Sequence, residues 1–245
     1  MVDRNKYLGD PETVRIPYRE LLSEERAKAW RATIDPKKAS ITSSLVAPTN
    51  IQEGMHTTHF TIADAHGNVA AVTVSLNDNF GSGWVVPGLG FFMNNEMEEF
   101  TTAPGQPNHW LLTQGNLNVV QPGKRMVTSM SPTIVLKDGK PLLALGSRGC
   151  PTIPSTILQV FLNVAVYRKS LFDAVDAPRI HQQSMPEEIF YEQGRLPATL
   201  LETLNGMGHG VIALDSIGDV HAILFERGKM TAVADPRHGG AAGGY

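Results

Sequence analysis

Alternating apolar and polar positions form the first clear pattern in the chain, and they begin at Thr57. Thr58, Phe60 and Ile62 occupy every second position of the run that follows. A short polar segment containing a glycine interrupts the alternation, which resumes from 69 to 75. A period of two residues is typical of β-strands with one buried face, and such a break between two runs favours a hairpin. The pattern therefore predicts an antiparallel β-hairpin that starts at Thr57.

The register of this hairpin follows from its turn. If Ala63 faces Val69, the pairing continues outward until Thr57 faces Ser75. Directly opposed side chains in an antiparallel pair have Cβ atoms roughly 4.5 to 5.5 Å apart, which brings two hydroxyl groups within hydrogen-bonding reach. Asn77 follows two positions later and is expected on the same side. The hairpin thus predicts three polar side chains together at its open end.

The remaining pattern predicts a mixed α and β fold. A helix is expected to start after Ser23 and to stop near Pro36, whereas residues 37–56 and 77–130 have the composition of a connector and of long loops. The other expected elements are a hairpin at 133–136 and 142–145, a buried helix within 151–168, short helices near 171–176 and 197–205, and strands at 211–214, 220–225 and 230–234. The prediction is one α+β domain from Thr57 onward, preceded by a helical segment.

Composition and charge exclude several functions. The 245 residues are 42% hydrophobic, which is enough for one substantial core. With 21 basic and 24 acidic residues and no basic run, neither nucleic acid nor an anionic membrane is an expected partner. The first twenty residues hold no continuous apolar stretch, so neither a signal peptide nor a membrane span is expected. Cys150 is the only cysteine and the histidines lack metal-ligand spacing, so we expect no disulfide, no metal and no cofactor.

Thr57 becomes a candidate nucleophile if the peptide bond before it is cut. A free α-amine titrates at about 7.7 to 8.0, so an appreciable part is unprotonated near neutral pH and lies within reach of the same residue's hydroxyl. The residue then serves as nucleophile and base together. The alternative interpretation is that a Thr-Thr pair simply reflects β-propensity at the start of a strand.

A series of motifs runs through nearly the whole chain. It comprises Thr57-Thr58-His59-Phe60, Leu76-Asn77, Phe80-Gly81-Ser82-Gly83, Asn94-Asn95-Glu96-Met97-Glu98-Glu99-Phe100, Lys124-Arg125, Ser129-Met130-Ser131-Pro132-Thr133, Gly146-Ser147 and Asp235-Pro236-Arg237. In order and spacing this series resembles the γ-glutamyltransferase (glutathione hydrolase) family. Residues 57–245 resemble its complete small subunit, and residues 1–56 resemble the end of its large subunit, including Leu8-Gly9-Asp10-Pro11.

The resemblance implies a fold and a reaction. The family consists of N-terminal-nucleophile (Ntn) hydrolases with a four-layer αββα sandwich, of which this chain would hold a part, because most of the large subunit is missing. Sheet edges and apolar faces would then be left uncovered. By resemblance, self-cleavage falls between His56 and Thr57. Thr57 would then attack the γ-glutamyl carbonyl of glutathione, and water or an acceptor amine would resolve the acyl-enzyme.

The resemblance also assigns roles to single residues. Ser75 matches a hydroxyl that assists the nucleophile. Asn77, Glu96 and Glu99 match the residues that hold the α-amino end of the glutamyl group. Thr128 and Ser129 match the residues that bind its α-carboxylate. Gly149 and Cys150 match the residues that form the oxyanion hole. The plainer alternatives are a solvated acidic face for the glutamates, hydroxyls bonded to local backbone, and a glycine that ends a strand.

Departures from the family pattern limit what is carried over. Cys150 stands where the family has a second glycine, so its side chain is expected either to crowd the pocket or to resist the backbone angle that glycine permits. Glu99 replaces an aspartate and Thr128 replaces a serine. The arginine that the family uses for the α-carboxylate belongs to the missing part of the large subunit.

Three hypotheses about function stay open. In the first, the chain works as an enzyme together with a large subunit from the same precursor or a separate chain, or by self-association. In the second, it is a truncated, inactive family member that acts at most as an interaction partner. In the third, it is a related acylase of the cephalosporin acylase or poly-γ-glutamate-cleaving type. The segment from Phe100 to Val127 resembles the family's substrate lid and favours a small substrate. The family is often periplasmic or extracellular, and the sequence leaves the compartment of this chain undecided.

Overall fold

The computed structural model describes residues 1–40 and 57–244. The described part begins with three short helices, α1 (Val2–Tyr7), α2 (Tyr18–Leu21) and α3 (Glu24–Ala32). Helix α3 starts as predicted, because the Ser23 hydroxyl accepts a hydrogen bond from the Arg26 N–H at 3.1 Å. The sequence pattern does not predict α1 and α2, since each is too short to show a period. Most of the predicted connector, including His56, lies outside the described residues.

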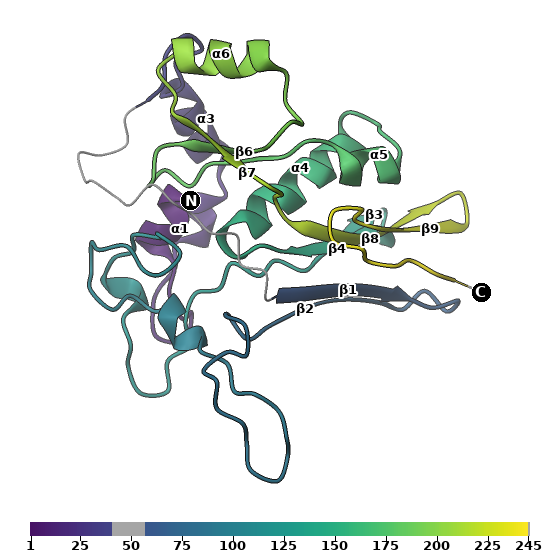
Figure 1. Cartoon of the computed structure of the whole chain (residues 1–245), viewed down its shortest axis with the longest axis horizontal. Coiled ribbons are helices and arrows are strands. Elements are labelled where there is room, and N and C mark those ends of the chain that lie inside the picture. Colours follow the sequence, from purple (N-terminus) through teal and green to yellow (C-terminus); the bar gives the residue numbers. More distant parts are fainter. Residues whose placement is uncertain (41–56, 245) are drawn as a thin grey trace.

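A four-stranded antiparallel sheet forms the centre of the molecule (Figure 1). Its strands, in spatial order, are β3 (Thr133–Lys137), β4 (Lys140–Arg148), β8 (Asp219–Glu226) and β9 (Lys229–Ala234). Helices α4 (Ile153–Ala165) and α5 (Leu171–Asp176) cover one face of this sheet. The main core lies between them and includes Leu143, Leu145, Ile153, Val160 and Val220. The predicted second hairpin, buried helix and last two strands are confirmed.

The first hairpin packs on the opposite face of the central sheet (Figure 1). Strands β1 (Thr57–Ala63) and β2 (Val69–Ser75) pair in the predicted register, with Ala63 facing Val69 and Thr57 facing Ser75. Helices, central sheet and hairpin are therefore three layers of an αββα sandwich. Phe60 and Ile62 remain 41% and 58% exposed on the outer side of the hairpin. This is the uncovered apolar face expected of a chain that holds only part of the sandwich.

His59 fixes how the hairpin sits on the central sheet. Its side chain is buried, with Nδ1 2.8 Å from the Thr73 hydroxyl and Nε2 3.0 Å from the Thr61 hydroxyl. Burial, and to a smaller extent His221, lowers the pKa of His59 to about 4, so the ring is neutral at physiological pH. The ring lies against the backbone of Gly146 in β4, where an added Cβ would come within 2.2 Å of it. Only glycine leaves room for this contact.

A smaller sheet lies beyond the central one. It contains β5 (Ile180–His181), β6 (Ile189–Glu192) and β7 (Val211–Leu214), with β6 and β7 parallel, and α6 (Ala198–Gly206) contacts β7. Strand β7 and helix α6 confirm the prediction, whereas the sequence pattern does not predict β5 and β6. The first of these two strands is only two residues long, and the second ends in a buried charged residue, Glu192, so neither shows an apolar alternation.

Buried charges tie the smaller sheet to the end of the chain. Arg179 pairs with Asp235 at 2.6 Å, and Arg237 pairs with Asp235 at 3.0 Å and also with Glu192. Both carboxylates are completely buried, and each is matched by an arginine. Removing one member of such a network leaves an uncompensated buried charge, which typically costs several kcal/mol. The Asp235-Pro236-Arg237 motif is therefore structural in this fold.

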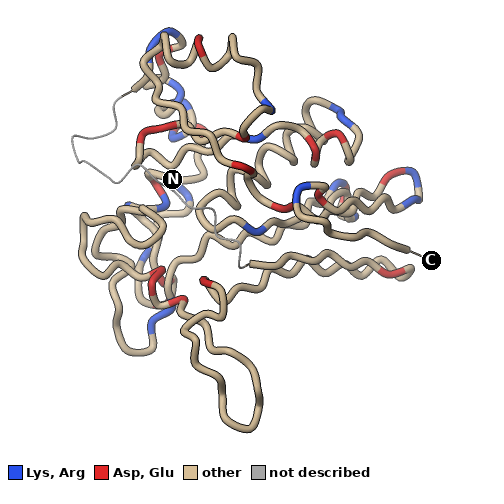
Figure 2. The backbone as a smooth tube through the Cα atoms, viewed as in Figure 1, with Lys and Arg blue, Asp and Glu red and all other residues tan. Residues whose placement is uncertain are grey.

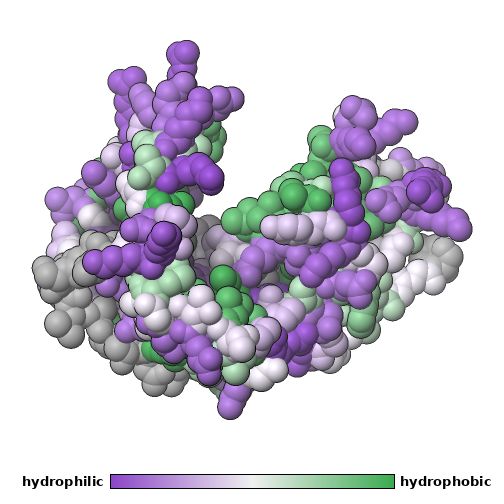
Figure 3. All heavy atoms as spheres, turned by 90° about the horizontal axis from the view of Figure 1, so that it is seen from above, coloured by the Kyte–Doolittle hydropathy of each residue, from purple (hydrophilic) through white to green (hydrophobic). Residues whose placement is uncertain are grey.

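Charge and hydrophobicity are distributed unevenly over the surface. Figure 2 shows lysines and arginines spread over several elements and mixed with acidic residues. Figure 3 shows hydrophobic side chains gathered over α4 and α5, where Leu158, Val166 and Phe172 are exposed. Among the described residues, none of the helices combines the length and the apolar character needed to cross a membrane.

The contact between His59 and Gly146 generates a prediction. Gly146→Ala forces the hairpin away from the central sheet, and overpacking of this kind typically costs ~1–3 kcal/mol. We expect a lower urea midpoint with an unchanged slope. The matched control is Gly206→Ala at the end of α6, where an added Cβ meets nothing within 4 Å. Equal stability of the two variants would contradict this account of how the hairpin is seated.

Candidate active site

One small cavity brings the predicted residues together. It is lined by Thr57, Ser75, Asn77, Glu96, Glu99, Thr128, Ser129, Met130, Cys150 and Ile153. Eight of the nine residues singled out in the sequence are in this lining, and the ninth, Gly149, directly precedes Cys150. The free space is about 10 Å³, which is room for about one water molecule. The site is therefore assembled from segments far apart in the sequence, and it is narrow.

Thr57 and Ser75 form its reactive pair. The Thr57 hydroxyl donates to the Ser75 Oγ at 3.1 Å, as the register of the hairpin requires. The same Oγ accepts a hydrogen bond from the Asn77 N–H at 2.9 Å. Thr57 is only 4% exposed. A hydroxyl at the start of a strand, held by a second hydroxyl beside a cavity, is placed to attack a group bound there.

Asn77 is held rigidly behind this pair. Its backbone has a φ of 73°, a left-handed conformation that asparagine tolerates better than most residues. The Trp110 Nε1–H donates to its Oδ1 at 2.9 Å, and its Nδ2 donates to a Glu98 carboxylate oxygen at 3.2 Å. Trp110 comes from the 100–127 segment. No local pattern in the sequence indicates Trp110 or Glu98, because these contacts join segments that are far apart in the chain.

Glu96 and Glu99 turn inward from a short 3-10 helix, η1 (Glu96–Glu99), and both are buried. The solvated-face interpretation is therefore wrong for these two, whereas Glu98 is exposed. Burial raises the pKa of Glu96, and a hydrogen bond from Ser75 opposes the rise. Burial raises the pKa of Glu99 to about 7; Arg4 opposes this rise, and Glu96 and Glu98 add to it. The Glu99 Oε2 is buried without a hydrogen-bond partner, so the site has an unused acceptor.

The two hydroxyl residues at 128 and 129 differ from each other. Thr128 is exposed, and its hydroxyl accepts from the Met130 N–H at 3.1 Å, which matches the local-backbone alternative. Ser129 is buried, and its Oγ accepts from the Arg4 guanidinium at 3.1 Å. The Ser129 proton therefore remains available to an acceptor in the cavity.

Gly149 and Cys150 form the turn between β4 and the 3-10 helix η3 (Cys150–Thr152), which leads into α4. Both have positive φ angles, 122° and 50°. Cys150 thus adopts the backbone conformation that its side chain was expected to resist, at an energetic cost on the order of 1 kcal/mol. Its side chain packs with Trp110 and Leu112 in a small buried cluster and lines the cavity, so the expected crowding of the pocket stays a prediction.

The beginning of the chain packs behind the site and against the 100–127 segment. Asp10, which is buried, accepts hydrogen bonds from the backbone and side chain of Arg125, and the Arg125 side chain lowers the pKa of Asp10 to about 2. Gly9 lies against the Leu117 carbonyl so closely that an added Cβ would be 2.4 Å away. These contacts explain why residues 8–11 and Lys124-Arg125 occur together in the motif series. They hold the 100–127 segment beside the cavity.

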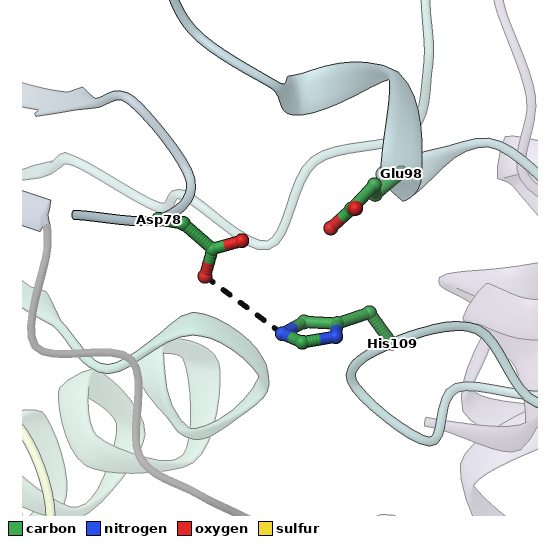
Figure 4. Close-up of side chains that lie close together, drawn as sticks. All are labelled: Asp78, Glu98 and His109. Atoms are coloured by element: carbon green, nitrogen blue, oxygen red, sulfur yellow. Dashed lines mark ion pairs between the residues drawn. The ribbon is translucent and has the colours of Figure 1, made fainter. Parts of the chain in front are cut away.

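Asp78, Glu98 and His109 form a polar cluster next to Asn77 (Figure 4). Their possible metal-ligand atoms all lie within 4.8 Å of one another, and the His109 Nε2 is 3.8 Å from an Asp78 oxygen. Tertiary contacts create this cluster, so the spacing of histidines in the sequence could not indicate it. The carboxylates already accept hydrogen bonds from Asn95 and Asn77. We interpret the cluster as a structural support that holds the Asn77 side chain in place.

A larger hollow lies elsewhere and has different chemistry. It has a volume of about 900 Å³ and is bounded by β1, β8, β9 and residues 241–244. None of the nine predicted site residues lines it. Its walls are mainly apolar, so we place the candidate active site in the small cavity, where hydroxyl and carboxyl groups converge.

The layers and the threonine at the start of β1 define the class of the protein, which is that of the N-terminal-nucleophile hydrolases. The family profile described as Gamma-glutamyltranspeptidase matches residues 1–245. The chain therefore belongs to the gamma-glutamyltranspeptidase family, and the resemblance found in the sequence is confirmed.

Three relatives show the extent of the similarity. The chain is 41% identical to the glutathione hydrolase proenzyme of Pseudomonas sp. (strain A14) over 91% of its own length, and it spans 39% of that proenzyme. It is 38% identical to gamma-glutamyltranspeptidase from Pseudomonas nitroreducens complexed with L-DON, with a TM-score of 0.74, covering 77% of this chain and 99% of that one. It is 25% identical to cephalosporin acylase from Bacillus halodurans, with a TM-score of 0.78, covering 96% of this chain and 41% of that one.

The raised pKa of Glu99 predicts a pH-dependent stability difference. Between its ordinary value of 4.5 and about 7, the folded chain holds a proton that the unfolded chain releases, so this group's contribution to stability falls as pH rises through that window. Glu99→Gln removes the dependence. We expect the stability of the unsubstituted chain relative to this variant to be lower at pH 8 than at pH 5, by on the order of 2 kcal/mol.

Urea unfolding at the two pH values measures this difference. Glu24→Gln is the control, because the Glu24 side chain in α3 is 87% exposed. If Glu99→Gln and Glu24→Gln have the same pH dependence, the carboxyl group of Glu99 is not in the buried environment described above.

Proposed function

We propose that this chain forms the catalytic part of an enzyme that transfers or hydrolyses the γ-glutamyl group of glutathione and related compounds. The observation that carries the proposal is the convergence of eight predicted residues on one cavity, with Thr57 3.1 Å from Ser75. Cleavage between His56 and Thr57 gives Thr57 a free amine, which takes the hydroxyl proton as the Oγ1 attacks the γ-glutamyl carbonyl. The released amine carries away that proton, and water or an acceptor amine then resolves the ester.

Each end of the glutamyl group has a complementary partner in this scheme. The α-ammonium group faces Glu99, whose Oε2 has no hydrogen-bond partner and accepts a charge-assisted hydrogen bond, with Glu96 and Asn77 beside it. The α-carboxylate accepts the free proton of Ser129, with Thr128 at the margin. The backbone N–H groups of Gly149 and Cys150 stabilise the oxyanion, a role typically worth roughly 10²- to 10³-fold in rate per donor.

Substrate entry requires the cavity to widen, because its present free space is about 10 Å³. The 100–127 segment is the element whose movement would open it, since Trp110 from that segment reaches Asn77 behind the nucleophile. We therefore assign this segment the role of a lid that closes over the glutamyl group.

A partner completes the sandwich in this proposal. The chain spans about two fifths of the proenzymes it resembles, as its 39% coverage of the Pseudomonas sp. (strain A14) protein illustrates. The outer side of the hairpin exposes Phe60, Ile62 and Val74, the last at 55%. A large-subunit segment, from the same precursor or from a separate chain, would cover this face, and self-association is the other arrangement. Residues 1–56 then act as the end of the large-subunit part and residues 57–245 as the catalytic domain.

A related acylase is the second candidate. The similarity to cephalosporin acylase extends over 96% of the chain, and Cys150 narrows the cavity relative to a glycine. An acyl group without an amine would bring no cation to Glu96 and would leave Glu99 with only Arg4, 3.9 Å from its Oε2, which is less favourable. The two glutamates therefore favour a γ-glutamyl substrate over a glutaryl one.

The nucleophile assignment gives a direct activity test. The chain is joined behind the preceding part of the Pseudomonas sp. (strain A14) proenzyme, and release of nitroaniline from a γ-glutamyl nitroanilide is measured. Thr57→Ala is expected to abolish turnover, because it removes the attacking oxygen. Thr58→Ala, the neighbouring threonine on the exposed side of β1, should retain activity within about threefold, as is usual for exposed positions.

Activity that survives Thr57→Ala would refute the assignment and direct attention to Ser75. Absence of turnover in the unsubstituted joined protein would favour the inactive family member over the enzyme.

A further inference from the structure

Arg4 is a buried cation that the proposed reaction does not use. It lies in α1, its side chain is only 11% exposed, and it is not among the residues that line the cavity. One amino group of its guanidinium donates to the Ser129 Oγ at 3.1 Å and lies 3.9 Å from the Glu99 Oε2. Its other amino group is held by the Asn5 side chain at 3.1 Å. The guanidinium thus sits behind the wall of the site, between the two residues assigned to opposite ends of the substrate.

The contact with Ser129 fixes the role of that hydroxyl. A serine hydroxyl donates one proton and accepts through its lone pairs, and an arginine donates only. Because Arg4 occupies a lone pair of Ser129, the hydroxyl proton is free to point into the cavity, where it can meet an anion. Without the arginine, the same hydroxyl could turn its proton towards any nearby acceptor instead.

The contact with Glu99 fixes the charge of that carboxyl group. The charged groups that act on Glu99 are Glu96 and Glu98 from η1, which disfavour ionisation, and Arg4 from α1, which favours it. Arg4 is the one cation among these groups. The Glu99 side chain is 5% exposed, so solvent screens the pair little. A carboxylate that is to bind an ammonium group must be ionised, and Arg4 is the charged group that favours this form of Glu99.

We propose that Arg4 is a positioning residue that makes the site selective for an acyl group carrying both an α-ammonium and an α-carboxylate, by orienting Ser129 as a donor and favouring the ionised form of Glu99. This inference rests on the proposed γ-glutamyl transfer and names the residue behind its head-group selectivity. Arg4 does not touch the substrate in this scheme. Arg4 preorganises one wall of the cavity for a zwitterionic head group before the substrate binds.

The first measurement is independent of catalysis. The full chain is labelled with ¹³C at the glutamate carboxyl carbons, and the Glu99 signal is assigned with Glu99→Gln. Removing an opposite charge at this distance typically moves a carboxyl pKa by about one to three units, so Arg4→Met should move the Glu99 midpoint upward by that amount. Arg4→Lys keeps a cation and should restore most of the midpoint. Lys6→Met, which removes an exposed cation from the same helix, should leave it unchanged.

The second measurement compares two acyl groups in the chain joined to the preceding proenzyme part. The substrates are γ-glutamyl nitroanilide and glutaryl nitroanilide, which lacks the α-amine. At pH 7, Arg4→Met should raise KM for the γ-glutamyl compound about fivefold or more relative to the glutaryl compound, since a rise of one unit from about 7 lowers the ionised fraction of Glu99 about fivefold. The two values of kcat should change by less than about threefold, and Arg4→Lys should be intermediate.

The possible outcomes distinguish the role of Arg4 from the proposed γ-glutamyl transfer. An unchanged Glu99 midpoint in folded Arg4→Met, or an equal rise in KM for both anilides, overturns the role of Arg4 in recognising the ammonium group, and an unchanged KM for both overturns its role at Ser129. If Arg4→Met does not fold, Arg4→Lys is the deciding variant. It keeps the positive charge, so loss of the preference for the γ-glutamyl over the glutaryl anilide in this variant would also overturn the role of Arg4. If neither anilide is turned over by the unsubstituted protein, the proposed function fails, while the carboxyl titration still decides whether Arg4 sets the ionisation of Glu99.

Discussion

The packing of the β1–β2 hairpin against strand β4 determines the geometry of this protein. The His59 ring lies on the backbone of Gly146, at a position where a single added carbon would collide with it. Because β4 continues from Gly146 to the turn at Gly149 and Cys150 within four residues, the contact fixes β1 relative to that turn. Thr57, at the start of the same β1 strand, is thereby brought to the cavity that Cys150 lines. A shift of the hairpin by one residue would turn Thr57 to the other face.

Charged side chains in and behind the cavity also determine the properties of the site. The cavity contains two buried carboxyl groups, and burial raises the pKa of both. Arg4 opposes this rise for Glu99, and it comes from helix α1 at the beginning of the chain. The buried pair of Asp10 and Arg125 fastens the same N-terminal region to the 100–127 segment. Residues 1–10 therefore pack behind the cavity, where Arg4 contacts two of the residues that line it, Glu99 and Ser129.

Local patterns in the sequence predicted a large part of this arrangement. The alternation from Thr57 gave the strands, and a short turn left one register, so the Thr57 and Ser75 pairing followed without other knowledge. Strand β6 was not predicted, because the buried Glu192 is satisfied by Arg237 from 45 residues away. Trp110, Glu98 and Arg4 were missed for the same reason. Their importance lies in contacts between distant segments, and no spacing along the chain records these contacts.

The family resemblance contributed what neither periodicity nor spacing could. It indicated Glu96, Glu99 and Ser129 as neighbours of Thr57, although 39 residues or more separate them from it in the sequence. The structure adds the difference between Thr128 and Ser129, since only the latter is buried and paired with Arg4. It also shows that Cys150 has a φ of 50°, in the region that favours glycine.

The intact mass of the joined protein tests the central claim most directly, because self-cleavage needs only the Thr57 oxygen and its immediate surroundings. The account predicts a fragment comprising residues 57–245 with Thr57 as its first residue, identified by mass and by N-terminal sequencing. A single uncut species, or a cut at any other bond, would contradict the placement of the nucleophile at the start of β1.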